Sequence, residues 1–224
     1  MGSIDEILAD YEALRPGQEA FYQDLHRHPE LSHQEHDTAR RVADRLQGDG
    51  LTVQTGIGGT GVVGVLANGS GPVVLLRCEL DALPLREDTG APYASTVTVQ
   101  DASGHEVPVD HACGHDMHMA CMTTMAKLMA DHRDQWHGTL ITLFQPAEET
   151  GEGAQEMVDD GLFKRIPCPT SRWPSTCCPA SPAPWPPARA RSCRPRTASR
   201  SPCTGEAATA PCRSTPSTRW CSPP

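Results

Sequence analysis

Three short stretches of the sequence concentrate side chains that can bind a metal ion or move a proton. They are "CELDALP" with Glu79 and Asp81, "HACGHD" with His111, Cys113 and His115, and "PAEE" with Glu148 and Glu149. Thiolate and imidazole groups together suit Zn²⁺ or a similar borderline metal. Carboxylates can bind a metal or accept a proton. The three stretches therefore predict a hydrolytic metal site, provided that the fold brings them together.

The stretch "HACGHD" offers the main candidate ligands. Cys113 and His115 are separated by one glycine, so both side chains can point from a loop into one cavity. The alternative is that Cys113 is a buried structural residue beside helix-capping residues. The further histidines between positions 111 and 118 favour a metal site.

The stretch "PAEE" places two carboxylates side by side. Adjacent residues in a tight turn face different directions, so Glu149 can bind a metal while Glu148 takes a proton from water. The alternative is a solvated acidic turn at the start of a helix, where carboxylates suit the helix dipole. The position directly after the apolar run 138–145 favours the site.

Glu79 and Asp81 stand at the end of a second apolar run and project to one side of it, because strand side chains alternate. We expect Asp81 to orient a ligand or to bridge two metal ions, with Glu79 in support. The alternative for Asp81 is a turn cap before Pro84. His26 and His28 precede a proline and predict a structured turn.

The elements that must position these stretches alternate between helices and strands. Helical spacing is found in 3–16 and 17–29, which both end at proline, and in 34–50, 115–136 and 153–163. Apolar runs at 61–67, 72–80 and 138–145 predict strands buried on both faces. This order predicts an α/β sandwich, in which a site forms outside the carboxyl ends of the strands.

Composition divides the 224 residues near Pro167. The formal net charge is −9, yet every histidine, every lysine and all acids except Glu206 precede Pro167, and the remainder is rich in arginine. An Arg-rich tail can bind nucleic acid or an acidic partner, but without an accompanying aromatic or glycine pattern we do not expect nucleic acid. Most of the ten cysteines lie in this tail.

The cellular location follows from the start of the chain. "MGSIDEILADYEALRPG" is acidic and lacks a charged-then-apolar leader, so a cytoplasmic protein with reduced thiols is expected rather than a disulfide scaffold. No apolar run approaches ~20 residues, so no membrane span is expected.

Residues 167–224 contain no Ile, Leu, Val, Met, Phe or Tyr beyond Pro167. Such a segment cannot bury enough surface to offset chain entropy, so we expect disorder after a partial domain at 1–166. A reading-frame shift explains the composition. In the shifted frame, each true codon consists of the last base of one visible codon and the first two bases of the next. Codons for Cys and Trp begin with TG, so the true codon that overlaps one of them ends in TG and must encode Val, Leu or Met. The alternative is a genuine Pro/Arg-rich linker or interaction tail.

Four motifs resemble one enzyme family in order and spacing. They are "LHRHPELSHQE", "LRCELDALPL", "DHACGHDMHMA" and "FQPAEETGEGA", and the resemblance covers about residues 5 to 166. The sequence resembles metal-dependent N-acyl-amino-acid amidohydrolases, which include hippurate hydrolases and hydrolases of auxin–amino-acid conjugates. That family usually has Asp where Glu79 stands.

The resemblance implies a site, a fold and a reaction. Cys113, His115 and Glu149 would bind Zn²⁺ or Mn²⁺, as one ion or two, and Glu148 would be the general base. The fold would be the N-terminal part of an aminopeptidase-like three-layer α/β catalytic domain, which in the family is interrupted by a smaller lid that often dimerises. The substrate would be a small N-acyl amino acid, hydrolysed at its amide bond.

The resemblance also implies that this chain is incomplete. The family uses two further histidine ligands, yet no histidine follows His137 here. We therefore expect the 224-residue chain to lack the lid, to be inactive and to be poorly soluble. Two alternatives remain: a non-catalytic metal- or partner-binding protein with an Arg/Pro-rich docking tail, and a hydrolase with Cys113 as nucleophile.

Overall fold

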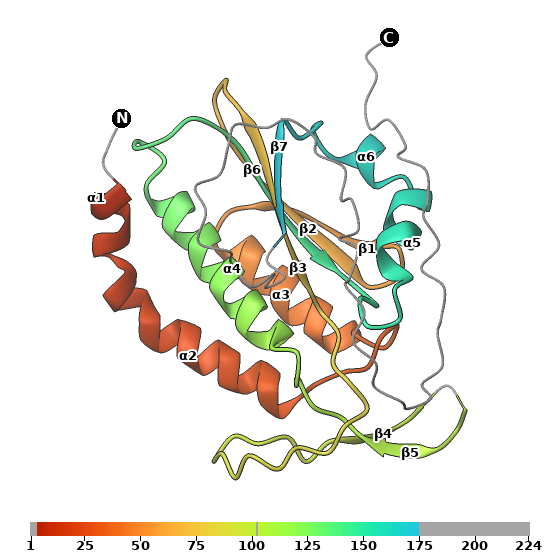
Figure 1. The fold of residues 1–224 in the computed structure, drawn as a ribbon. Helices are drawn as coiled ribbons and strands as arrows, with labels where there is room; N and C mark the ends of the chain where they lie inside the picture. The colour runs from red at the N-terminus through yellow and green to blue at the C-terminus, as the bar shows by residue number, and fades with distance from the viewer. Residues whose placement is uncertain (1–3, 102, 175–224) are drawn as a thin grey trace, which may run out of the picture. The chain divides into compact units, whose positions relative to one another are not determined.

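A computed structural model describes residues 4–101 and 103–174, and its centre is a five-stranded mixed sheet (Figure 1). The strand order is β1-β2-β6-β3-β7. The bounds are Thr52–Ile57 for β1, Gly61–Asn68 for β2, Val73–Glu79 for β3, Gly138–Gln145 for β6 and Ser171–Pro174 for β7. β2 is antiparallel to both neighbours, whereas β3 is parallel to β6 and to β7.

Side chains of the central strands alternate between two cores because successive residues of a strand point to opposite faces. On β6, Leu140 and Phe144 join one core, while Ile141 and Leu143 join the other. The strands predicted at 61–67, 72–80 and 138–145 are confirmed, and both faces of the sheet are covered.

Helices cover the two faces of the sheet (Figure 1). The bounds are Ile4–Ala9 for α1, Tyr11–Arg27 for α2, His36–Gly48 for α3, His115–Asp131 for α4, Gly153–Asp159 for α5 and Leu162–Arg165 for α6. Residues of α2, α3 and α4 share the core on one face, and residues of α5 and α6 share the core on the other. The predicted three-layer α/β fold is therefore confirmed.

Two predicted helices are divided differently in the structure. The helix expected at 153–163 is split into α5 and α6, because the chain turns at Gly161, which has a φ of 83°. The helix expected to end at Pro16 runs through it, and the break falls at Asp10, between α1 and α2. A proline inside a helix removes the bond to the carbonyl four residues earlier, which here belongs to Glu12. Both Glu12 and Pro16 are exposed, so water can satisfy that carbonyl and the helix continues.

Two features of the fold were not predicted from the sequence. The first is β1, which forms a hairpin with β2. The second is a small hairpin of β4, Thr98–Gln100, and β5, Glu106–Pro108, which packs on a minor core around Leu31, Ala82 and Val109. This hairpin follows the segment that carries Asp81 and precedes the one that carries Cys113.

Regular structure continues past the boundary expected near residue 167. Residues Ser171–Pro174 form β7, which pairs in parallel with β3. The rest of the expected tail, 175–224, lies outside the described residues. Among the helices that the structure describes, none has the length and apolar character needed to span a bilayer.

Candidate metal centre

The carboxyl ends of β3 and β6 bring two of the three chemical stretches together. The parallel register pairs Glu79 with Gln145, so the chain leaves both strands at the same edge of the sheet. The third stretch enters from the loop before α4, whose first residue is His115. The expected convergence at the carboxyl ends of strands is therefore observed for Asp81, His115 and the "PAEE" turn.

Asp81 connects all of these segments and is only 1% exposed. Its Oδ2 accepts hydrogen bonds from the Ser32 hydroxyl at 2.7 Å and from the Glu149 backbone N–H at 2.9 Å. Burial alone would raise the pKa of Asp81, but hydrogen bonds from His115, Glu149 and Ser32 outweigh it and lower the pKa to about 2. Asp81 is thus an ionised anchor for the neighbouring groups.

His115 is buried, and each of its ring nitrogens has a different environment. Nδ1 donates to the Asp81 carbonyl oxygen at 2.8 Å and lies 3.4 Å from Asp81 Oδ1. Nε2 lies 3.8 Å from Glu148 Oε2 and 3.8 Å from Glu149 Oε1. Ligand atoms of these three side chains lie within 4.8 Å of one another. An imidazole oriented through Nδ1, with Nε2 facing carboxylates, is typical of a metal-binding histidine.

The two adjacent glutamates differ in their surroundings. Glu149 Oε1 is buried and has no hydrogen-bond partner among the described residues. Burial, followed by the charge of Glu149, raises the pKa of Glu148, whose side chain keeps 31% exposure. A carboxylate with a raised pKa and access to water suits a general base, and an orphaned carboxylate oxygen suits a metal ligand.

Cys113 lies beside this cluster rather than within it. The thiol is exposed and free, and its hydrogen bond with Glu149, together with burial and the nearby carboxylates, raises its pKa to about 11. An activated nucleophilic cysteine needs a lowered pKa, so this environment does not favour the nucleophile alternative. A cation bound here would have to displace the thiol proton.

Glu79 and His111, the other candidate supporting residues, do not join the three-residue cluster. Glu79 is fully buried, pairs with Arg77 at 2.8 Å and accepts a bond from His118 Nδ1 at 3.0 Å. Neither ring nitrogen of His111 has a hydrogen-bond partner in the described chain, and burial lowers its pKa to about 3. His111 is therefore a neutral imidazole beside the site.

A residue that the sequence did not reveal holds the "PAEE" turn. Glu35 is completely buried, and its carboxylate accepts bonds from the Ala147 N–H at 2.8 Å and the Thr60 hydroxyl at 2.7 Å. Ala147 has a φ of 47°, a conformation that costs a non-glycine residue free energy. The only available signal was an acidic residue just before a helix, which normally indicates a cap.

Replacing Glu35 should destabilise the fold through this turn. Glu35→Ala leaves the Ala147 N–H and the Thr60 hydroxyl without their charged acceptor, and we expect a loss of about 3 kcal/mol in the free energy of unfolding. Asp44→Ala, on the exposed side of α3, should change it by less than about 0.5 kcal/mol. Urea unfolding followed by circular dichroism measures both, and equal effects would contradict the assigned role.

The pKa of His115 predicts a pH dependence in the absence of metal. Burial lowers this pKa, but the bonds to Asp81 raise it from 6.5 to about 8. The protonated ring therefore stabilises the fold fully below pH 6.5, and this contribution disappears as the pH rises through about 8.

With a chelator present, the stability of the wild type relative to His115→Gln should thus fall by about 1–2 kcal/mol between these limits, allowing for solvent screening. Denaturant titrations at several pH values measure it. A constant difference between the two proteins would contradict the assigned contact.

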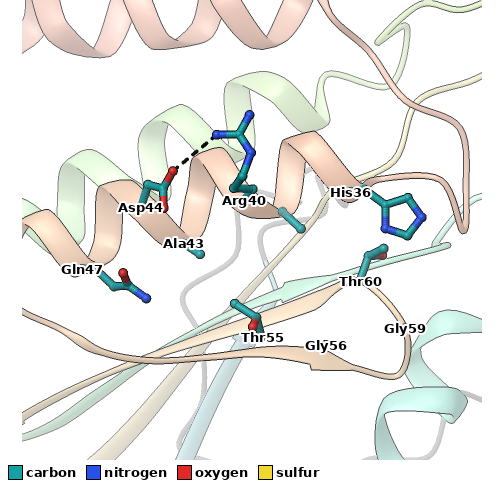
Figure 2. Close-up of a pocket in the computed structure, with 10 residues that line it drawn as sticks. His36, Arg40, Ala43, Asp44, Gln47, Thr55, Gly56, Gly59 and Thr60 are labelled. Atoms are coloured by element: carbon teal, nitrogen blue, oxygen red, sulfur yellow. Dashed lines mark hydrogen bonds and ion pairs between the residues drawn. The ribbon is translucent and has the colours of Figure 1, made fainter.

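A separate pocket of about 320 Å³ lies between α3 and the β1–β2 hairpin (Figure 2). It is lined by polar side chains that include His36, Arg40, Asp44 and Thr60. Figure 2 shows Arg40 directed toward Asp44, with which it forms an ion pair of 3.5 Å. None of the candidate ligands lines this pocket, so it is not the centre described above.

Comparison with known proteins agrees with the geometry. Residues 75–183 match the sequence model of peptidase family M20/M25/M40. The hippurate hydrolase of Campylobacter jejuni is 40% identical over 170 residues, which are 74% of this chain and 40% of that enzyme. IAA-amino acid hydrolase ILR1-like 5 of Arabidopsis thaliana is 34% identical over 142 residues, which are 63% of this chain and 31% of that enzyme.

A solved structure is similar as well. The dinuclear metal-binding peptidase of the M20 family from Bacillus subtilis has a TM-score of 0.61 and 33% identity, covering 69% of this chain and 41% of that one. The chain spans 31% to 40% of the length of the two relatives above. The matched segment contains Asp81, Cys113, His115, Glu148 and Glu149, so the chain is similar to peptidase family M20/M25/M40 over the stretch that carries the candidate site.

Proposed function

We propose that this chain carries the N-terminal part of a metal-dependent hydrolase that cleaves the amide bond of small N-acyl amino acids. The observation that carries the proposal is the convergence of His115, Glu148 and Glu149 within 4.8 Å at the carboxyl ends of β3 and β6. The relatives named hippurate hydrolase and IAA-amino acid hydrolase support the substrate class.

The residues present fit a divalent cation. The Oε1 atom of Glu149 is buried and has no hydrogen-bond partner among the described residues, and His115 is oriented by Asp81 as metal-binding histidines commonly are. We assign Cys113, His115 and Glu149 as ligands. The thiol of Cys113 favours Zn²⁺, whereas the carboxylates are also suitable ligands for Mn²⁺. The dinuclear character of the Bacillus subtilis relative supports one or two ions.

The protein side chains then divide the reaction between them. A cation at this position would supply Lewis acidity. Glu148 accepts a proton from the attacking water and delivers it to the nitrogen of the leaving amino acid. The backbone carbonyl of Asp81 keeps His115 in one tautomer and the Asp81 carboxylate accepts from the Glu149 backbone N–H, so a single residue fixes two neighbours of the site.

We further propose that this 224-residue chain is inactive, because its tail is translated out of frame after about residue 167. The absence of Ile, Leu, Val, Met, Phe and Tyr beyond Pro167 supports this. The intact enzyme would be cytoplasmic and homo-oligomeric. The free thiols of Cys78, Cys113 and Cys121 are consistent with a reducing compartment.

Two preparations test the proposal: the 224-residue chain and a version with the reading frame restored between codons 165 and 170. We expect the restored protein to hydrolyse hippurate, to lose this activity with a chelator and to regain it with Zn²⁺ or Mn²⁺. The 224-residue chain should show none of it. If the restored protein hydrolyses no N-acyl amino acid, the proposed function is refuted. If the 224-residue chain shows metal-dependent hydrolysis, its proposed inactivity is refuted.

A further inference from the structure

A second cluster of metal-binding groups lies outside the candidate metal centre. It combines His26 near the end of α2, Glu87 in the segment between β3 and β4, and Asp110 between β5 and α4. One ligand atom from each of the three lies within 4.8 Å of the others. None of the three is assigned a part in the hydrolytic reaction.

The two ring nitrogens of His26 have different partners. Nδ1 lies 2.6 Å from Asp116 Oδ2 and donates to it, while Nε2 lies 3.2 Å from Glu87 Oε1. The side chains of His26, Glu87 and Asp116 are 11%, 1% and 2% exposed. In the neutral ring, a carboxylate that fixes Nδ1–H leaves the Nε2 lone pair for a cation, which would replace the proton that Nε2 shares with Glu87 in the protonated ring. This is the arrangement around most metal-binding histidines.

Asp110 supplies an independent observation. The residue is 8% exposed, and its Oδ1 is buried without a hydrogen-bond partner among the described residues. Its backbone is fixed by two hydrogen bonds with Leu83, each of 3.0 Å. Burying a carboxylate oxygen without a hydrogen-bond partner raises the free energy of the folded state. A carboxylate whose backbone is fixed in such a position therefore indicates a positive group that binds there.

The surroundings of the cluster are negative and shielded from water. Three carboxylates, from Glu87, Asp110 and Asp116, face a single imidazole. Burial and the charges of Asp116 and Glu87 contribute to raising the pKa of Tyr22 to about 12. The rings of Tyr22 and Tyr93 lie 5.6 Å and 5.4 Å from the His26 ring and form an aromatic wall.

We propose that His26, Glu87 and Asp110 bind a divalent cation at a second site, with Asp116 orienting His26. Oxygen ligands with one imidazole suit Mn²⁺ in particular. The cation would tie α2 to the segment that follows β3 and to the loop that leads into α4. This site is structural and goes beyond the proposed hydrolytic function, because it uses none of the ligands assigned there.

The test removes the first site and counts the cations that remain. In the full chain carrying Cys113→Ser and Glu149→Gln, electron paramagnetic resonance of a Mn²⁺ titration should show one saturable site. Adding Asp110→Asn should abolish it. Adding Glu106→Gln, which alters an exposed carboxylate in the neighbouring β5, should leave it unchanged.

Asp116→Asn tests whether weaker Mn²⁺ binding reflects the site itself or a loss of folding. It removes no ligand, and it should weaken Mn²⁺ binding about 10–100-fold through His26 while circular dichroism stays unchanged. The proposal is overturned if the chain with only Cys113→Ser and Glu149→Gln binds no Mn²⁺. That result is expected if a protonated His26 alone neutralises the carboxylates. Undiminished binding in the Asp110→Asn protein overturns the proposal as well.

Discussion

Glu148→Gln is expected to lower the kcat of the frame-restored enzyme by about 10²–10⁴-fold, the usual contribution of a general base. The amide of Gln cannot take up the proton of the attacking water. Glu148 has a raised pKa and a side chain that is 31% exposed, so water has direct access to it. Steady-state hydrolysis of hippurate measures kcat, and equilibrium dialysis measures the affinity for Zn²⁺ or Mn²⁺.

Metal affinity separates the base from the ligand. It should change by less than about threefold in Glu148→Gln but fall about 10-fold or more in Glu149→Gln. Glu152→Gln is the matched control, because Glu152 follows in the same turn, is 63% exposed and pairs with His33 instead of the site. Equal kcat values for Glu148→Gln and the wild type would remove Glu148 from the mechanism.

Gly153→Ala is expected to damage both the stability and the metal site of the chain. A Cβ at Gly153 would lie 1.8 Å from the Pro146 carbonyl oxygen, a backbone atom that cannot rotate away. Either α5 or the turn with Glu148 and Glu149 must move. Overpacking of this kind should cost about 3 kcal/mol of unfolding free energy. We expect metal affinity to fall about tenfold at the same time, as for other displaced ligand shells.

Gly48→Ala provides the control for Gly153→Ala. It makes the same chemical change at the end of α3, but a Cβ there meets no atom of the described residues within 4 Å. Urea unfolding should show little change for Gly48→Ala, and a metal titration should show none. Wild-type behaviour of Gly153→Ala in both measurements would mean that the turn is more adaptable than its contacts indicate.

Most of the fold could be predicted because burial leaves a periodic trace in the sequence. The runs at 61–67, 72–80 and 138–145 are apolar on both faces, and the sheet is covered on both sides. The β1 strand is only partly buried and left no such trace. The helix break at Asp10 rather than Pro16 depends on exposure, which a proline does not reveal by itself.

The candidate site shows the same division. His115, Glu148 and Glu149 stand in motifs with several reactive residues together, and the structure brings them into one cluster. Glu35 and Ser32 could not be assigned, because they act through contacts with residues that are distant in sequence. Cys113 was predicted to be a metal ligand. It lies beside the cluster and contacts Glu149, so its role as a ligand stays a proposal.

The parallel ladder between β3 and β6 constrains which changes in chain length the protein can accept. It runs without interruption from Val73↔Thr139 to Glu79↔Gln145. Deleting one residue inside either strand would slide one chemical motif past the other by about 3.3 Å and invert which side chains face each core. Natural length variation among homologues should therefore accumulate in connections such as 69–71 and 101–105, and spare both strands.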